Sequence, residues 1–299
     1  MRRVGLIVHG GRDAAVQAGK EIAAWLAERD VTTRCVEGEF DGADESVEAD
    51  RLADGLDLIV SIGGDGTLLR AAHLASPSGV PLLGVKVGRL GFLTEVEPSE
   101  AIGVVQEAMA GRMTIEERTA VEGRPVGAEW SEPQWALNEI IVEKRARHRL
   151  VTLRASVGGE YVTTFSADGV IVATPTGSTA YSFSARGPIV SPRVEGLLLT
   201  PVSPHMVFDR SIVLAPEEGV TLEVLGEEPG LLSADGRPAL ELPVGSKVVI
   251  ERSSHPARLV RRPDAPSFFA LLREKFSLPG NAGSGSAPPS TSGHVGPAG

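Results

Sequence analysis

The chain has 299 residues and a hydrophobic fraction of 42%, which predicts two domains, each large enough to bury its own core. Its net charge of −10 argues against a protein that binds nucleic acid through a generally basic surface. The single cysteine, Cys35, excludes an intrachain disulfide and a zinc cluster built from cysteines. The N-terminal apolar run is too short for a secretory signal and no run is long enough to span a membrane, so we expect a cytoplasmic protein.

Strands and helices alternate in the first part of the sequence. An aliphatic strand at residues 4–8 leads into residues 9–12, and Asp13 is placed to begin a helix with one apolar face. The elements predicted after it are a strand at 31–36, a surface loop with one short helix at 37–57, a strand at 57–62, a helix at 67–74, a strand at 80–86 and a helix near 98–110. This alternation predicts a parallel sheet with helices on its faces.

The segment Gly63-Gly64-Asp65-Gly66-Thr67 links an aliphatic strand to a helix. Its glycines allow backbone N–H groups to approach a phosphate closely, and Asp65 could orient Mg²⁺ or accept a proton there. The alternative is an ordinary turn with Asp65 as a helix cap. Ligands of parallel sheets lie beyond the carboxyl ends of the strands, where this segment and residues 9–12 both fall, and this favours a ligand site. Residues 87–94 could form a second ligand loop, although a plain turn explains them better.

Short β-rich runs replace the helical periodicity after Gly111. They lie at 136–142, 150–157, 161–165, 170–173, 212–214, 221–225 and 247–251, and Gly, Pro and Asp separate them, as in antiparallel sheets. The domain boundary is therefore expected near residues 112–116. An amphipathic helix at 267–276 is expected to pack back on the first domain, and the polar, Gly-rich residues after it are expected to be disordered.

Two segments of the β-rich part carry polar groups suited to a ligand. Asn138 and Glu139 place an amide and a carboxylate at the mouth of a strand, although a simple polar strand start has the same pattern. Residues 174–184 contain seven hydroxyl groups and the aromatic face of Tyr181. Such a loop suits ribose hydroxyls and a stacked base. A solvated Ser/Thr-rich loop is the alternative, but such loops rarely lie between two aliphatic β runs.

Spacing excludes several familiar sites. The third glycine of a dinucleotide fingerprint would fall at Leu69, and no GxxxxGK[ST] loop occurs. Gly177-Ser178-Thr179-Ala180 lacks the second glycine of a nucleophile elbow, and the six histidines show no metal-ligand spacing.

Taken together, the motifs resemble those of the NAD kinase family over roughly residues 3–276. In chain order they are residues 63–67, residues 88–93, Asn138-Glu139, Asp168-Gly169, the run at 174–182, residues 203–205 and Asp235-Gly236. The first motif also resembles loops of diacylglycerol kinases, sphingosine kinases and phosphofructokinases. The run at 174–181 is far more specific to the NAD kinase family. The resemblance implies phosphorylation of the 2′-hydroxyl of the adenosine ribose of NAD, giving NADP. It further implies ATP or polyphosphate as donor, Mg²⁺ or another divalent cation, and a homodimer or homotetramer.

The resemblance also implies an α/β fold followed by a β-sandwich-like domain. The expected parts are an α/β phosphate-donor domain at 1–114, a β-rich NAD-binding domain at 115–262, a C-terminal helix at 263–276 that returns to the first domain, and a disordered tail at 277–299.

By motif match, Asp65 is similar to the family's catalytic aspartate and is expected, with Gly66 and Arg70, to contact substrate. Gly63, Gly64, Gly66 and Thr67 would hold the donor phosphates. Asn138 and Glu139 would bind the ribose and adenine region of NAD, and Asp168 the other end of the dinucleotide, where a neighbouring subunit can contribute. The other implied substrate-binding residues are Arg149, Ser166, Thr176, Thr179, Ala180, Tyr181, Ser182, Phe183 and Ser184. Arg237 stands where many family members carry glutamine, so no ligand role is assigned to it.

Two other functions share some of these features. A diacylglycerol-type lipid kinase has the same glycine loop but calls for an apolar groove and a membrane-facing surface, which an aromatic content of 4% does not favour. A non-catalytic NAD sensor would keep the pocket without turnover, and the intact Asp65 weighs against it. Neither a nucleic acid nor a membrane is expected as a partner.

Overall fold

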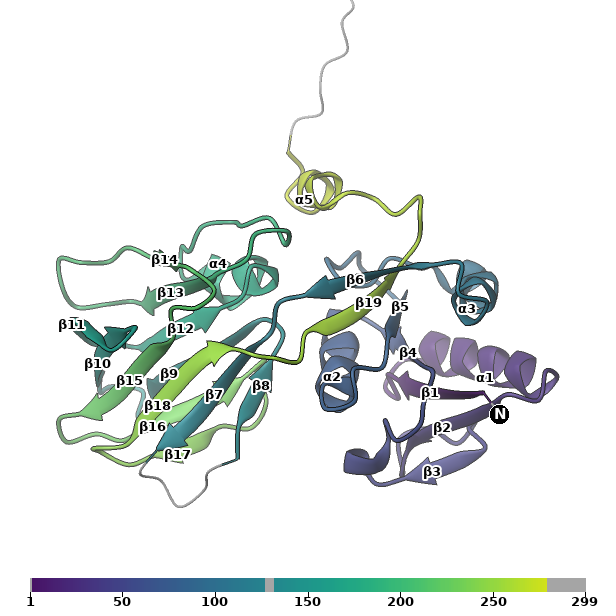
Figure 1. Ribbon diagram of the computed structural model, residues 1–299, viewed down its shortest axis with the longest axis horizontal. Coiled ribbons are helices and arrows are strands. Elements are labelled where there is room, and N and C mark those ends of the chain that lie inside the picture. The colour runs from purple at the N-terminus through teal and green to yellow at the C-terminus, as the bar shows by residue number, and fades with distance from the viewer. Residues whose placement is uncertain (1, 127–131, 279–299) are drawn as a thin grey trace, which may run out of the picture.

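The computed structural model describes residues 2–126 and 132–278, which form two domains lying side by side (Figure 1). The strands of the first domain are β1 Arg3–Val8, β2 Thr32–Val36, β3 Glu45–Val47, β4 Leu58–Gly63, β5 Leu82–Lys86, β6 Thr114–Arg118 and β19 Ala257–Arg261. They form one seven-stranded sheet in the order β3-β2-β1-β4-β5-β19-β6. Neighbouring strands are parallel except for β19 and β6, which are antiparallel.

Helices cover both faces of this sheet. On one face α1 (Asp13–Ala27) and α3 (Ala101–Met109) pack with Val60 and Ile62 of β4, and on the other α2 (Asp65–Ala75) packs with Ile59. Every residue of β4 is buried, as expected for a central strand of a parallel sheet covered on both faces. Single-turn 3₁₀ helices lie at Ala49–Arg51 and Pro98–Glu100. The predicted α/β architecture is confirmed.

Three strands of this sheet differ from the expectation. Residues 37–57 contain the short parallel strand β3 as well as the expected single-turn helix. The predicted boundary after residue 114 falls inside β6, which pairs with β19 in the sheet of the first domain. The chain therefore crosses to the second domain after Arg118 and returns at Ala257. The sequences of β6 and β19, TIEER and ARLVR, are rich in charged residues. No apolar pattern therefore assigned these two strands to the sheet.

The second domain consists of two six-stranded antiparallel sheets packed face to face. One sheet has the order β11-β10-β15-β18-β7-β8, with bounds Glu160–Ala167, Val151–Val157, Val220–Leu225, Lys247–Arg252, Val121–Val126 and Gln134–Ala136. The other has the order β14-β13-β12-β9-β16-β17, with bounds Ile212–Leu214, Leu197–Val202, Gly169–Ala173, Glu139–Lys144, Gly230–Ala234 and Leu240–Leu242. Their inward-facing aliphatic side chains form one core with Phe165 at full burial. The expected β-sandwich-like domain is confirmed.

A smaller core covers the outer face of the second of these sheets. Ile141, Ile171 and Leu198 on this face are buried beneath the segment that holds the 3₁₀ helix η3 (Thr176–Thr179) and the short helix α4 (Tyr181–Ser184). Ala185 and Val190 complete the packing. The hydroxyl-rich segment is therefore a structured cover on the sheet, not a solvated loop.

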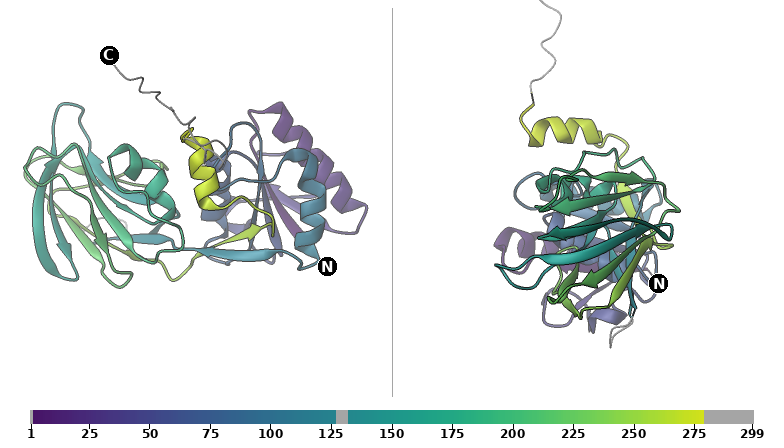
Figure 2. Two further views of the ribbon diagram at one scale, coloured as in Figure 1. Left: turned by 90° about the horizontal axis from the view of Figure 1, so that it is seen from above. Right: turned by 90° about the vertical axis from the view of Figure 1, so that its left-hand side faces the viewer.

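The last helix, α5 (Phe268–Lys275), lies between the two domains when they are seen from above (Figure 2). Ser267 caps its N-terminus by accepting a hydrogen bond from the N–H of Ala270 at 3.2 Å, and Leu271 is its buried residue. The helix was expected to pack on the first domain, and it contacts both domains. The ring of Phe276 lies 6.4 Å from that of Phe92 in the first domain and 4.9 Å from that of Phe183 in the second. Most of the tail predicted to be disordered, residues 279–299, lies outside the described residues.

Within residues 2–126 and 132–278, no helix is both long and apolar enough to cross a membrane.

Candidate active site

The glycine segment lies where β4 ends and α2 begins. Gly64 is the N-cap residue of α2, and Asp65 is its first residue. A side chain on Gly63 would meet the hydroxyl of Thr67 at 2.2 Å, so this glycine is required by packing. Side chains on Gly64 and Gly66 would meet no atom within 4 Å. Their absence leaves the backbone open to solvent, which is the arrangement that a phosphate at a helix N-terminus uses.

A cavity of about 520 Å³ opens over this segment, at the carboxyl ends of β1 and β4. Gly64, Gly66, Thr67 and Arg70 line it together with residues 7–12. Arg70 is ion-paired with Glu39, and the Arg12 guanidinium donates to the carbonyl of Val87. The cavity thus combines backbone N–H groups with the guanidinium of Arg12 and with that of Arg70, whose charge Glu39 partly offsets, a combination suited to an anion. Arg12 and His9 were placed at this sheet edge by the strand pattern but were not assigned to the site.

The Asp65 carboxylate is bound by the loop that follows β5. Its Oδ2 accepts the N–H of Phe92 at 2.8 Å, while Oδ1 accepts the N–H groups of Leu93 and Thr94 and the Thr94 hydroxyl, each at 3.2 Å. Gly91 is indispensable to this contact, because a side chain there would lie 1.8 Å from Asp65 Oδ1. Residues 91–94 are therefore more than the plain turn expected, since they orient the candidate catalytic carboxylate.

A second aspartate organises the strand mouth that carries Asn138 and Glu139. Asp235 accepts the backbone N–H groups of Leu137 at 2.7 Å, Asn138 at 2.8 Å and Glu139 at 3.1 Å. The Asn138 carbonyl in turn accepts the N–H of Thr174 at 2.8 Å. A side chain on Gly177 would meet that same carbonyl oxygen at 2.0 Å. The two sequence motifs of the second domain are thus joined through their backbones.

Glu139 is a buried carboxylic acid at this junction. Burial, and to a lesser extent the charge of Asp235, raises its pKa to about 8 against the smaller opposing effect of a backbone hydrogen bond from Tyr181. Its Oε2 atom has no hydrogen-bond partner among the described residues. The pKa of Tyr181 is also raised, by burial first and then by Glu143, Asp168 and Glu139. Tyr181 is thus within electrostatic reach of Asp168 and Glu139, and one carboxyl oxygen of Glu139 is buried without a hydrogen-bond partner among the described residues.

The sequence suggested that the hydroxyl groups at residues 174–184 are available to a ligand, but several of them are buried. Ser182 is fully buried and its hydroxyl bonds that of Thr200 at 3.2 Å. Buried Thr176 receives a hydrogen bond from Arg118 at 3.4 Å. Because these two side chains are buried and hydrogen-bonded, they hold the segment in place. The residues of this segment that reach the surface are Thr179, Ala180, Tyr181, Phe183 and Ser184.

Family models identify both halves of the chain. The ATP-NAD kinase N-terminal domain matches residues 4–113, and the ATP-NAD kinase C-terminal domain matches residues 137–262. The chain belongs to the NAD kinase family. Among curated NAD kinases it is 42% identical over 283 residues to one from Heliobacterium modesticaldum, covering 92% of this chain and 99% of the relative. It is 40% identical over 293 residues to NAD kinase 2 of Streptomyces coelicolor, covering 93% of this chain and 95% of the relative.

Two solved NAD kinase-family structures share the fold. A yeast NADH kinase complexed with NADH is similar with a TM-score of 0.82 and 26% identity, over 96% of this chain and 90% of that one. An NAD kinase from Archaeoglobus fulgidus in complex with ATP is similar with a TM-score of 0.72 and 26% identity, over 93% and 98% of the two chains. The α/β domain followed by a β domain is thus the family fold.

Three residues that the resemblance assigned to NAD kinase substrates have protein partners in this structure. Asp168 is ion-paired with Lys144 on the neighbouring strand. Arg149 lies 3.5 Å from Glu228 and its side chain is mostly exposed. Ser166 is on β11, in the other sheet, and its carbonyl accepts the N–H of His205. Of these, Asp168 joins the Glu139–Tyr181 group, while no described contact brings Arg149 or Ser166 to it.

The divalent cation expected for an NAD kinase does not have a protein-built site here. Within the part of the chain that the structure describes, no three His, Cys, Asp or Glu residues are grouped so as to hold a metal ion. The Asp65 carboxylate already accepts four hydrogen bonds, three of them on Oδ1, so only Oδ2 keeps an open acceptor position. The described residues therefore do not fit a metal held by the protein alone.

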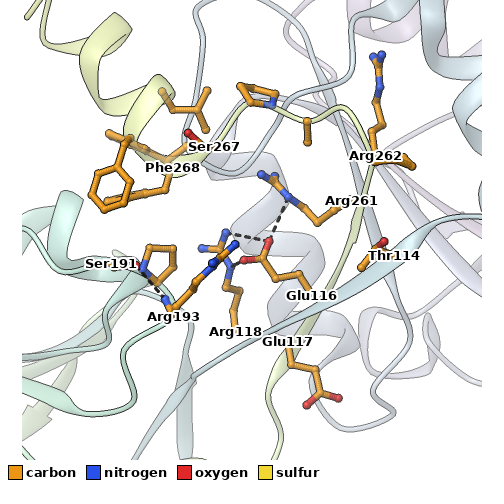
Figure 3. A pocket seen from close by; sticks show the side chains of 17 residues that line it. Thr114, Glu116, Glu117, Arg118, Ser191, Arg193, Arg261, Arg262, Ser267 and Phe268 are labelled. Carbon is orange, nitrogen blue, oxygen red and sulfur yellow. Dashed lines mark hydrogen bonds and ion pairs between the residues drawn. The ribbon is translucent and has the colours of Figure 1, made fainter.

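A second cavity, of about 610 Å³, lies between β6, β19, α5 and the loop at 191–193 (Figure 3). Four arginines line it: Arg118, Arg193, Arg261 and Arg262. Glu116 pairs with both Arg118 and Arg261, so much of this positive charge is neutralised within the cavity. None of the substrate-binding residues expected from the sequence lines it. The glycine-segment cavity, and not this larger one, is the candidate donor site of the kinase.

Proposed function

We propose that this NAD kinase-family chain phosphorylates the 2′-hydroxyl of the adenosine ribose of NAD. The observation that carries the proposal is the pairing of two half-sites on neighbouring domains. The first is the open glycine segment with Asp65 at its edge. The second is the preformed group of Asn138, Glu139 and Tyr181. A kinase needs a donor site and an acceptor site of these two kinds at one domain junction.

The donor half offers backbone N–H groups of Gly64 and Gly66, the N-terminus of α2, and the guanidinium groups of Arg12 and Arg70. These groups would hold and neutralise the phosphates of the donor. ATP as donor is supported by the Archaeoglobus fulgidus relative, which was solved with ATP. Polyphosphate as an alternative donor, and Mg²⁺, stay predictions. Because the described residues build no metal site, such an ion would take its ligands from the donor phosphates.

In the acceptor half, Glu139 is protonated at neutral pH because its pKa is near 8. A neutral carboxyl group can both donate to and accept from a ribose hydroxyl. Its Oε2 atom is buried without a partner among the described residues, so a bound hydroxyl group would satisfy it. Tyr181 and Phe183, both exposed, would present aromatic faces to the adenine.

Asp65 would act as the general base. As the 2′-oxygen attacks the terminal phosphorus, the hydroxyl proton passes to the Asp65 carboxylate and the bond from phosphorus to the leaving phosphate oxygen breaks. Oδ1 of Asp65 accepts three hydrogen bonds from Leu93 and Thr94, whereas Oδ2 accepts only that of Phe92, so Oδ2 is the oxygen that would receive the hydroxyl proton. These contacts keep the carboxylate oriented, which is the main requirement of phosphoryl transfer.

The test is NADP formation by the full chain incubated with NAD, ATP and Mg²⁺, with parallel reactions lacking the metal or replacing ATP by polyphosphate. We expect NADP with ATP, and we expect Asp65→Asn to abolish most of it while NAD still binds. NAD binding without any NADP from the wild type would contradict the proposal and identify a sensor. Size-exclusion chromatography with light scattering tests the predicted homodimer or homotetramer in the same preparation.

A further inference from the structure

The turn between β16 and β17 carries Asp235, Gly236 and Arg237 in a fixed conformation. Asp235 and Gly236 have φ angles of +49° and +68°, and the N–H of Arg237 donates to the Ala234 carbonyl at 3.0 Å. The Ser233 hydroxyl donates to the Arg237 carbonyl at 2.8 Å. The turn is thus closed by two hydrogen bonds, and the directions of its side chains follow from its backbone.

Arg237 crosses from this turn to the first domain. One terminal nitrogen of its guanidinium donates to Nε2 of His73 on α2 at 2.8 Å. The other donates to the carbonyl of Trp135, and Nε donates to the carbonyl of Ala234 at 3.1 Å. One planar group therefore holds two points of the second domain and one helix of the first, a geometry that a lysine cannot reproduce.

His73 has the protonation state that this contact requires. Burial, together with the positive charges of Arg237 and Arg70, lowers its pKa to about 4. The imidazole is therefore neutral at physiological pH, and its Nε2 can accept a hydrogen bond from the guanidinium while Nδ1 carries the ring hydrogen. Nδ1 has no partner among the described residues, so the Arg237 bond is the polar contact that this ring makes.

The same turn also organises the acceptor half. Asp235 accepts the N–H groups of Leu137, Asn138 and Glu139, two residues before Arg237 reaches α2. Asp65 and His73 lie on one helix, eight residues apart, which corresponds to about 12 Å along a rigid element. A short chain of contacts, from Asp235 through Arg237 and His73 to α2, therefore sets the position of Asp65, the candidate base, relative to residues 137–139.

We propose that Arg237 is a positioning residue that locks α2, and with it Asp65, in register with the Asn138–Glu139 turn. The inference rests on the proposed kinase function of the two half-sites. The contacts of Asp65 with residues 92–94 and of Asp235 with residues 137–139 do not involve Arg237, so its removal acts mainly on the alignment of the two half-sites. Phosphoryl transfer depends steeply on alignment, and a displacement of about 1 Å can cost roughly a hundredfold in rate.

The experiment compares Arg237→Gln, Arg237→Lys, His73→Ala and the double variant His73→Ala/Arg237→Gln by steady-state kinetics. Arg145→Gln is the matched control, since Arg145 forms an exposed ion pair with Glu241 on the same domain, away from α2. We expect Arg237→Gln to lower kcat roughly tenfold to a hundredfold, with KM values for NAD and ATP within about twofold of the wild type. The double variant should be no slower than the worse single variant, because both changes remove the same contact.

A readout that does not depend on activity is the NMR titration of His73. Removing the positive charge of Arg237 should raise the His73 pKa from its wild-type value. If the wild type forms NADP but Arg237→Gln keeps the wild-type kcat, or if the losses of the two single variants multiply in the double variant, the positioning role is wrong. If the wild type itself forms no NADP, the kinase proposal fails, and the titration still reports whether the contact between the domains exists.

Discussion

Asp65 and Asp235 make the same kind of contact in different domains. Each carboxylate collects the N–H groups of three consecutive residues of a distant loop: residues 92–94 for Asp65 and residues 137–139 for Asp235. In each, Oδ2 makes the shortest bond, at 2.8 Å or 2.7 Å, and Oδ1 accepts the remaining ones. Hydrogen bonding alone does not distinguish a catalytic aspartate from a structural one.

The surroundings of the two aspartates differ. Asp65 begins α2 between Gly64 and Gly66, which line a cavity, and its side chain is only partly buried. Asp235 is held in a closed turn, where burial raises its pKa and the three backbone hydrogen bonds oppose that rise. A carboxylate at the edge of a cavity can exchange one of its bonds for a substrate, whereas one enclosed by its own domain can only hold structure. The following predictions test this division of roles.

The largest effect is expected for Asp65→Asn. The amide has nearly the same shape but cannot accept the hydroxyl proton, so kcat should fall by roughly two to four orders of magnitude while the NAD dissociation constant changes little. Thr94→Val is the comparison variant, because it removes one hydrogen bond to Asp65 and leaves the charge in place. Its loss should be less than about tenfold. Equal losses in the two variants would show that Asp65 serves only to hold the loop.

Gly91→Ala should have the next largest effect. The new methyl group would lie 1.8 Å from Asp65 Oδ1, so the loop has to move away from the carboxylate. We expect a loss of about 1–3 kcal/mol in the free energy of unfolding, from overpacking, and a lower kcat because Asp65 loses its orientation. Gly103→Ala in α3 is the control, since a side chain there meets no atom within 4 Å. A Gly91→Ala protein with wild-type stability and turnover would mean that the loop contact is dispensable.

Asp235→Asn should change stability and the KM for NAD more than kcat. The amide can still accept from Asn138 and Glu139, but its NH₂ group would face the N–H of Leu137. Leaving a buried donor unpaired costs about 1–3 kcal/mol in the free energy of unfolding, and the acceptor turn should loosen. Denaturant unfolding and initial rates at varied NAD measure the two effects. A large loss of kcat with unchanged KM would place Asp235 in the catalytic group and break the comparison.

The sequence predicted those parts of the molecule that local patterns encode. Buried parallel strands such as β4 are continuous aliphatic runs, and the glycine segment after β4 is typical of a loop that joins a strand to a helix. The charged strands β6 and β19 could not be placed in the same way. Their pairing depends on contact between residues 114–118 and 257–261, which are far apart in the chain and carry no apolar pattern.

The site was predicted by motif but not by contact. The resemblance assigned both Asp65 and Glu139 to the substrate site, which stays a prediction. Nothing in the sequence indicates that residues 92–94 bind Asp65 or that Asp235 binds the backbone of Glu139. The burial of Ser182 was missed for a similar reason, since a hydroxyl group suits a ligand and a neighbouring strand equally well. The contact between Arg237 and His73 joins two domains, and only the folded chain shows it.

The smallest expected effect concerns the pH dependence of stability. Burial, helped by Asp235, raises the Glu139 pKa from 4.5 to about 8, so the folded protein holds a proton that the unfolded chain releases. The contribution of Glu139 to stability is therefore full below pH 4.5 and declines as pH rises to about 8. The slope from one such group is at most about 1.4 kcal/mol per pH unit. Glu139→Gln, which is neutral throughout, should remove this decline, whereas Glu241→Gln, an exposed control, should keep it. Melting temperatures measured across that range decide the matter. An unchanged slope in Glu139→Gln would mean that Glu139 is not a neutral acid in the folded protein and that the acceptor half carries its negative charge.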